Sequence, residues 1–151
     1  MYPLMFKLTG KKVVFVGGGK VASRKIRSLL TLSMPAITVV SDSIDDSLKK
    51  LCDEDKIYWI QSKFDENVID EKFDFAFICT NDKETNERAA DFFIKKGIPV
   101  NVCDDKELST FFMPAVFEEK DFVVAISTKG KSPTDSKEVK ELLKNCLKKR
   151  S

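Results

Sequence analysis

The sequence predicts an α/β domain built on a parallel sheet with helices on both of its faces. Three observations support this class. Short β-branched apolar segments recur along the first hundred residues, helical stretches of ten to fifteen residues separate several of them, and a glycine cluster follows the first segment directly. Such alternation is typical of βαβ units with right-handed crossovers. A length of 151 residues fits one compact domain with a short appendage.

The first strand and helix are the clearest of these elements. Residues 12–16 (KVVFV) form a short β-branched apolar run after Lys12, which predicts a strand buried on both faces of a parallel sheet. From Lys20 onward, apolar residues recur at the spacing of one helix face, namely Ala22, Ile26, Leu29 and Leu30. Pro35 ends that pattern because proline cannot continue the helical hydrogen bonds.

The later elements follow the same alternation. Four further strands are expected at residues 37–40, 57–60, 73–79 and 99–103. Two further helices are expected at residues 44–52 and 84–96, the second ending at Gly97 as a left-handed cap requires.

The pattern changes after Asp105. Apolar segments at 111–117 and 122–127 follow each other without an intervening helix, and a closing helix is expected over 137–149. We therefore expect a domain over residues 1–106 and a β-hairpin and helix appendage over 107–151. The apolar surface of this appendage has no obvious partner in the chain, which indicates a dimerisation unit. The alternative is that it packs back on the edge of the sheet.

The composition narrows the class of protein. The chain is 42% hydrophobic and 33% charged, and no apolar run reaches the roughly 20 residues that span a bilayer. The N-terminus lacks the features of a secretory signal, so we expect a cytoplasmic protein. A net charge of +2 gives little attraction for nucleic acid, although residues 137–150 are rich in lysine.

The residue types available for chemistry are also limited. The chain has no histidine, so proton transfer falls to a carboxylate, a lysine, a cysteine or the substrate itself. Its four cysteines form no C-x-x-C pair, and we expect them to be reduced structural thiols rather than ligands of a bound metal.

A glycine motif lies between the first strand and the first helix. It reads Gly17-Gly18-Gly19-Lys20-Val21-Ala22 and satisfies G-x-G-x-x-A in the context that gives this motif its meaning. Gly17 permits a tight turn, Gly19 lets the backbone approach a pyrophosphate, and Ala22 allows close packing of helix and strand. The motif predicts a Rossmann-type dinucleotide site.

Asp42 is the candidate partner for the adenosine ribose. It follows the second predicted strand, where an acidic residue would bind the ribose hydroxyls and repel a 2′-phosphate. No arginine follows closely, so NAD is favoured over NADP as the cofactor. The alternative is that Asp42 is an ordinary loop or N-cap residue.

Polar residues also follow the fourth and fifth predicted strands. Thr80-Asn81-Asp82 and Asp104-Asp105 should border the nicotinamide end, because ligands of such sheets lie beyond the carboxyl ends of the strands. From position alone, adjacent acids in a loop are more often solvated turn residues than catalytic ones.

Several motifs along the chain resemble one family. The chain opens on Tyr2-Pro3-Leu4-Met5-Phe6 and continues with the glycine motif and Arg24-Lys25. It then carries Thr80-Asn81-Asp82 with Asn86, Asn101-Val102-Cys103-Asp104, Phe111-Phe112-Met113-Pro114-Ala115, and Ser127-Thr128-Lys129-Gly130-Lys131-Ser132-Pro133. Together these are similar to the precorrin-2 dehydrogenase family, which is also the N-terminal domain family of siroheme synthases.

The resemblance implies an NAD-dependent oxidation of precorrin-2 to sirohydrochlorin, and some members of the family also insert ferrous iron. Asp104 matches the family's essential aspartate and would accept a proton or orient the macrocycle. By the same resemblance, Thr80, Asn81 and Asn101 are expected on the cofactor side. The segment Ser127, Thr128, Gly130, Lys131 and Ser132 is expected to bind substrate carboxylates, although a turn before a helix N-cap is the simpler explanation of its composition.

The chain also departs from the family pattern. It ends at Ser151 after one predicted helix, where members commonly have a further helical region, and Lys129 stands where glycine is frequent. The lack of histidine argues against iron insertion, because imidazole is a common iron ligand. The alternative function is an NAD-sensing regulatory module without catalysis, which would need neither Asp104 nor the 127–133 segment.

Overall fold

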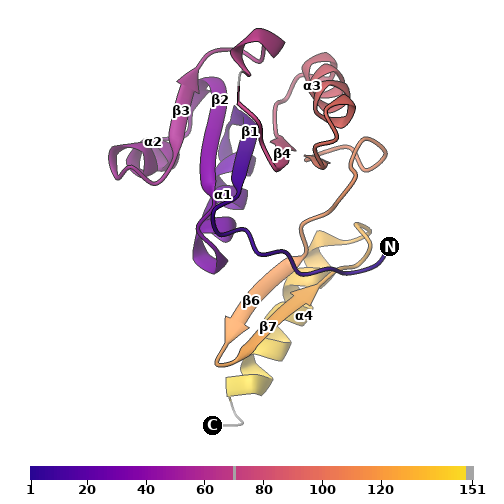
Figure 1. Cartoon of the computed structure of the whole chain (residues 1–151). Coiled ribbons are helices and arrows are strands. Elements are labelled where there is room, and N and C mark those ends of the chain that lie inside the picture. The colour runs from indigo at the N-terminus through magenta and orange to yellow at the C-terminus, as the bar shows by residue number, and fades with distance from the viewer. Residues whose placement is uncertain (70, 149–151) are drawn as a thin grey trace. The chain divides into compact units, whose positions relative to one another are not determined.

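The structure is a computed structural model that describes residues 1–69 and 71–148. It divides into two compact units. The larger unit comprises Phe6–Phe111, and the smaller one joins Met1–Met5 to the residues from Phe112 onward. Figure 1 shows the sheet of the larger unit and the hairpin and helix of the smaller one.

The larger unit is a five-stranded parallel sheet with the strand order β3-β2-β1-β4-β5. Its elements are β1 (Lys12–Gly18), α1 (Lys20–Leu32), β2 (Ala36–Ile44), α2 (Asp46–Asp53), β3 (Tyr58–Gln61), η1 (Glu66–Val68), β4 (Phe75–Ile78), α3 (Lys83–Lys95) and β5 (Val100–Val102). The predicted α/β class with a parallel sheet is confirmed. The direction of winding reverses between β1 and β4, and this switch point is where ligands of such sheets bind.

Alternating residues of the central strands give the sheet two apolar faces. On one face, Val14, Ala76 and Val100 pack with Phe93 of α3 in a single cluster in which each is fully buried. Residues of the opposite parity point to the other face. There Phe15 stacks on Phe77 with ring centroids 4.6 Å apart.

An aromatic chain extends this second face. The Phe111 ring makes edge contacts with Phe75 and Phe77, at 5.7 and 5.3 Å between centroids, and Phe6 contacts Phe75 in the same way. Phe111, at the start of the segment predicted at 111–117, therefore packs on the sheet within the larger unit. It is not part of a strand, because β6 begins only at Ala115.

Strand β2 differs most from its prediction. It runs to Ile44, which was expected to begin a helix and instead pairs with Gly18 of β1. The register changes between Val16, which faces Val40, and Gly18, so β2 carries extra residues opposite Gly17. This is a β-bulge, which redirects side chains at the end of a strand. Helix α2 then begins after Asp45, whose carboxylate accepts a hydrogen bond from the Ser47 N–H at 3.0 Å.

The smaller unit holds an antiparallel hairpin and one helix. Strands β6 (Ala115–Glu119) and β7 (Phe122–Ile126) pair with each other, and α4 spans Pro133–Lys148. The helix begins earlier than the predicted 137, because Ser132 Oγ accepts the Asp135 N–H at 3.1 Å as an N-cap. Several large apolar side chains of this unit are exposed, namely Phe122, Val123, Val139, Leu142 and Leu143.

No helix within residues 1–69 and 71–148 is long and apolar enough to span a membrane.

Candidate functional site

A groove of about 850 Å³ lies at the carboxyl ends of β1, β2 and β4, at the switch point of the sheet. This volume is in the usual range of small-molecule and cofactor sites. Most of the residues predicted to bind a cofactor line it, namely Gly17, Gly18, Gly19, Lys20, Val21, Asp42, Thr80 and Asn81. The structure thus brings together predicted residues from three separate segments of the chain.

At two of the three positions in the loop, neighbouring protein atoms leave no room for a side chain. Gly17 has φ +97°, and a Cβ placed on it would lie 2.7 Å from the carbonyl oxygen of Cys79. A Cβ on Gly18 would lie 2.5 Å from the side chain of Ile44. Gly19 is different, because its backbone is extended and a Cβ there would meet no protein atom within 4 Å. The space above Gly19 belongs to the groove and is free for a ligand.

The N-terminus of α1 opens into the same groove. Gly19 is the N-cap and supplies no side-chain hydrogen bond to the first turn. The first N–H groups of a helix have no partner within the helix, and with the helix dipole they favour an anion. Ala22 is fully buried under this turn, as close packing of helix and strand requires. Lys20, also on the groove, adds a positive charge.

The bulge of β2 brings further residues to the groove that sequence patterns did not reveal. Ser41 and Ser43 flank Asp42 there, and Lys63 and the buried Phe64 line the groove beyond β3. The change of register at Gly17 places Ser41, Asp42 and Ser43 along the edge of the groove. No local sequence signal marks such a bulge, so sequence analysis did not identify the two serines. Asp42 itself is exposed, with its carboxylate available to a ligand.

Asp45 and Asp82 are two further carboxylates on this groove, and each caps a helix. Hydrogen bonds from the hydroxyl and the backbone N–H of Ser47 hold the pKa of Asp45 below its usual value. The Thr85 hydroxyl, which donates to Asp82 at 2.7 Å, lowers the pKa of Asp82 in the same way. Both carboxylates therefore serve the termini of α2 and α3.

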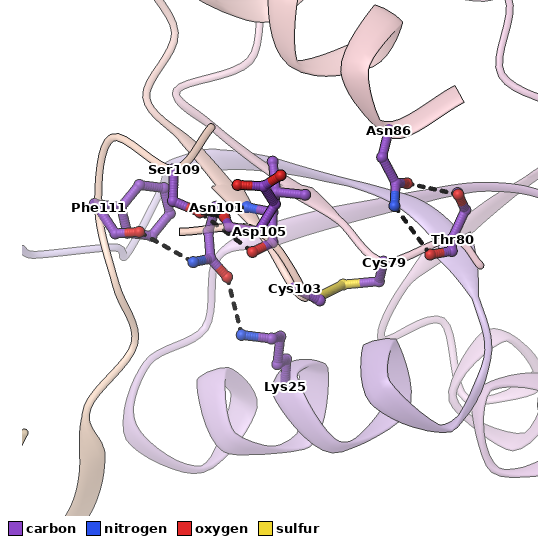
Figure 2. Close-up of a disulfide and its surroundings, with 10 residues drawn as sticks. Lys25, Cys79, Thr80, Asn86, Asn101, Cys103, Asp105, Ser109 and Phe111 are labelled. Carbon is purple, nitrogen blue, oxygen red and sulfur yellow. Dashed lines mark hydrogen bonds between the residues drawn. A yellow bond between two sulfur atoms is a disulfide. The ribbon is translucent and has the colours of Figure 1, made fainter. Parts of the chain in front are cut away.

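Asn86 fixes the loop that follows β4. This buried side chain of α3 donates to the Thr80 carbonyl at 3.1 Å and accepts the Thr80 hydroxyl at 2.5 Å (Figure 2). The neighbouring Asn81 is exposed on the groove. The pairing explains why a polar residue is tolerated at position 86 on the inner face of a helix, and it holds Thr80 and Asn81 in place.

Replacing Asn86 by leucine is expected to lower the free energy of unfolding by about 1–3 kcal/mol, because the hydroxyl and carbonyl of the half-buried Thr80 lose their hydrogen bonds to Asn86. Urea unfolding followed by circular dichroism measures the change. Asn81→Ala is the control, since it alters an exposed residue of the same loop and should leave the midpoint in place. Equal stability of Asn86→Leu and wild type would contradict this account.

Asn101, Asp104 and Asp105, which the sequence places together at the end of β5, have different surroundings in the structure. Asp105 is structural, because its carboxylate accepts the backbone N–H groups of Glu107 and Leu108 at 2.8 and 3.1 Å. Asp104 is exposed and makes no side-chain hydrogen bond within the described residues. Asn101, predicted on the cofactor side, does not line the groove and has a side chain that is only 4% exposed.

The expectation that all cysteines are reduced thiols is wrong for two of them. Cys79 and Cys103 form a disulfide, with Cα atoms 5.3 Å apart, while Cys52 and Cys146 are free (Figure 2). Ile78 pairs with Val102 in neighbouring parallel strands. The residues that follow them, Cys79 and Cys103, therefore lie side by side. A separation of 24 residues in sequence concealed this adjacency. Among the described residues, no group of three acidic or cysteine side chains is placed to hold a metal ion.

The predicted carboxylate-binding segment lies in the smaller unit, between β7 and α4. Much of its polarity serves the turn, because the Thr128 hydroxyl accepts the Ser132 N–H and donates to the Ser132 carbonyl, both at 3.0 Å. Lys129 adopts φ +56°, the left-handed region that favours glycine. Ser127 and Lys131 are exposed. Ser127 Oγ also accepts the Lys129 N–H at 3.2 Å, so the turn explanation holds for Ser127, Thr128 and Ser132 and leaves the Lys131 side chain available.

Comparisons with known proteins agree with this picture. Residues 4–115 match the family model NAD_binding_7, described as "Putative NAD(P)-binding". Siroheme synthase 1 of Aeromonas salmonicida is 34% identical over 145 residues, and the siroheme synthase of Methylococcus capsulatus is 32% identical over 145 residues. The alignments cover 96% of this chain but only 31% and 30% of those relatives, so the chain spans about a third of their length.

A solved structure is similar to this chain, and the alignment covers a larger share of that protein than of the siroheme synthases. The structure of SirC, precorrin-2 dehydrogenase, superposes with a TM-score of 0.81 at 30% identity. The alignment covers 96% of this chain and 70% of that one. The prediction of an NAD(P)-binding domain is confirmed. The chain belongs to the precorrin-2 dehydrogenase family, which is also the N-terminal domain family of siroheme synthases.

Proposed function

We propose that this chain is an NAD-dependent dehydrogenase that oxidises precorrin-2 to sirohydrochlorin. The observation that carries the proposal is the groove at the switch point, with its glycine loop and uncapped helix, in a chain related over nearly its whole length to a precorrin-2 dehydrogenase. Relatives that are siroheme synthases support the same pathway.

The groove fits a dinucleotide. The pyrophosphate would lie above Gly19, where the backbone is open, and would accept hydrogen bonds from the first N–H groups of α1. Asp42 would bind the adenosine ribose from the bulge of β2, and its charge favours NAD over the 2′-phosphate of NADP. Thr80 and Asn81, held by Asn86, would border the nicotinamide end.

The reaction removes a hydride and a proton from the tetrapyrrole. Bound NAD supplies the hydride acceptor. Asp104 would receive the proton or orient the macrocycle, because it is the exposed carboxylate at the end of β5 that no hydrogen bond of the described chain engages. Ser127 and Lys131 would bind acetate or propionate groups of the substrate, for which a hydroxyl and an ammonium group are suitable partners.

We propose that the protein is a homodimer and that the smaller unit forms the interface. Phe122 is 60% and Leu142 is 65% exposed, and both belong to a unit of one hairpin and one helix. Exposed apolar groups gathered on so small a unit are typical of an interaction surface. We expect a second copy of the chain to be the partner on this surface.

The function is tested by incubating the purified chain with precorrin-2 and NAD under anaerobic conditions. Equal amounts of sirohydrochlorin and NADH, each followed by absorbance, are the expected result. A chain that binds NAD but gives no product would overturn the dehydrogenase proposal in favour of an NAD-sensing module. Adding ferrous iron after sirohydrochlorin has formed tests iron insertion in the same vessel, through the change to the siroheme spectrum.

A further inference from the structure

The disulfide of Cys79 and Cys103 lies at the wall of the groove. It joins the residue that follows β4 to the residue that follows β5 (Figure 2). Cys79 lines the groove together with its neighbour Thr80, whereas Cys103 does not line it. One end of this covalent bond therefore belongs to the wall of the proposed NAD site, on the side where the nicotinamide would lie.

The backbone of both cysteines is fixed independently of the disulfide. The Cys79 N–H donates to the Val16 carbonyl at 2.7 Å, and the Cys103 N–H donates to the Ile78 carbonyl at 2.9 Å. A Cβ on Gly17 would collide with the Cys79 carbonyl, so β1 and β4 are in close contact at this point. Opening the disulfide should therefore leave both backbones in place, and the side chains must take up the change.

Two reduced thiols need more room than a disulfide. Bonded sulfur atoms lie about 2.05 Å apart, whereas atoms that share no bond repel each other below about 3.5 Å. At least one of the two side chains must turn about its Cα–Cβ bond when the disulfide opens. Cys79 is only 8% exposed, and the groove is the open space that it borders. The groove is therefore the space into which the freed Cys79 thiol would turn.

The disulfide can exchange with an external dithiol. Cys103 is half-buried and thus more accessible than Cys79, so a thiolate of the reductant attacks Cys103 Sγ. The bond between the two protein sulfurs breaks, and Cys79 leaves as a thiolate that takes up a proton. The second thiol of the reductant then attacks the mixed disulfide and releases Cys103 as a thiol. The protein disulfide is reduced to two thiols, and the dithiol is oxidised to a disulfide.

Building on the NAD site of the proposed function, we propose that Cys79 and Cys103 form a reversible thiol–disulfide site that controls NAD binding. In the disulfide form, the bond to Cys103 holds the Cys79 side chain away from the nicotinamide end of the groove. In the dithiol form, the Cys79 thiol occupies that end, and NAD must displace it in order to bind. Because binding effects are reciprocal, NAD favours the disulfide over the dithiol by the same factor.

The state of the cysteines is measured first, by titrating thiols in the unfolded chain. After exposure of the folded chain to oxidised glutathione and removal of the reagent, two thiols are expected, those of Cys52 and Cys146. After reduction with dithiothreitol, all four cysteines should titrate. A chain in which Cys79 and Cys103 remain reduced in oxidised glutathione overturns the inference.

NAD binding to the two forms is then compared by calorimetry. The reduced chain should bind NAD about three- to tenfold more weakly, the factor expected when a ligand forces one side chain out of its preferred rotamer. The double variant Cys52→Ala/Cys146→Ala is the control for the other thiols, because neither residue lines the groove, and it should respond to dithiothreitol as wild type does. Equal or tighter binding by the reduced chain overturns the inference.

Two single variants separate the effect of the thiol from the loss of the cross-link. Cys79→Ala and Cys103→Ala both abolish the disulfide, but only Cys103→Ala keeps a thiol on the groove. Cys103→Ala should bind NAD as weakly as the reduced wild type, and Cys79→Ala should bind it more tightly than Cys103→Ala. Neither variant should respond to dithiothreitol, and circular dichroism checks that both are folded. Equal affinities of the two variants would contradict the role given to the Cys79 thiol.

This inference and the proposed function fail in different ways. A chain that oxidises precorrin-2 but binds NAD equally well in both forms overturns the redox control and leaves the dehydrogenase in place. A chain whose NAD affinity changes as expected, but which gives no sirohydrochlorin, overturns the dehydrogenase and leaves the redox control in place. A chain that binds NAD in neither form overturns both.

Discussion

Asp104→Asn is expected to lower kcat for precorrin-2 oxidation by about 10²–10⁴-fold, the range that a group positioned for proton transfer contributes. The chain has no histidine that might substitute for it. The affinity for NAD, measured by calorimetry, should stay unchanged, because Asp104 does not line the groove. The variant should also fold normally, since the Asp104 side chain is exposed and makes no hydrogen bond within the described residues.

Asp105→Asn is the matched control for this result. The two residues are adjacent carboxylates at the same strand end, but Asp105 accepts two backbone N–H groups and is occupied by the turn. An amide oxygen can still accept those hydrogen bonds, so kcat should change by only a few fold. Equal losses in the two variants would show that the assignment of Asp104 is wrong and that the whole turn, rather than one carboxylate, matters.

For Asp104 and Asp105, the sequence predicts the position of both acids but not which of them is free to act on a substrate. The fifth strand and its polar end could be predicted from the apolar segment and the acids that follow it. Which acid is free depends on the path of the turn, because only the structure shows Asp105 capping the N–H groups of Glu107 and Leu108. Resemblance to the family singled out Asp104, and the hydrogen bonds of Asp105 give an independent physical reason for the same choice.

Other features escaped prediction because they depend on the register between distant segments. The bulge that carries Ser41 and Ser43 to the groove exists only relative to β1. The disulfide of Cys79 and Cys103 needs β4 and β5 to be neighbours in phase. By contrast, the first strand, the glycine loop and the first helix follow from local spacing and were placed correctly. Asn101 was noticed as part of a motif, but its partner Lys25 lies 76 residues away in sequence.

Substitutions in the glycine loop are the second prediction with a large effect. Valine at Gly19 is expected to weaken NAD binding, whereas valine at Gly17 is expected to destabilise the fold. Gly19→Val should fold as wild type and lose NAD affinity by about 100-fold or more. Its Cβ meets no protein atom but fills the space where the pyrophosphate would approach the N–H groups of α1. Two hydrogen bonds to a charged group, each of about 1.5–3 kcal/mol, account for a loss of this size.

Gly17→Val should instead lower the free energy of unfolding by roughly 3 kcal/mol or more. Its φ of +97° disfavours a side chain, and a Cβ would lie 2.7 Å from the Cys79 carbonyl oxygen, within the rigid sheet. Urea unfolding and NAD calorimetry on both variants separate the two causes. If Gly19→Val bound NAD as wild type does, the pyrophosphate would lie elsewhere. If Gly17→Val were as stable as wild type, the close approach of β1 to β4 at this point would not be a constraint.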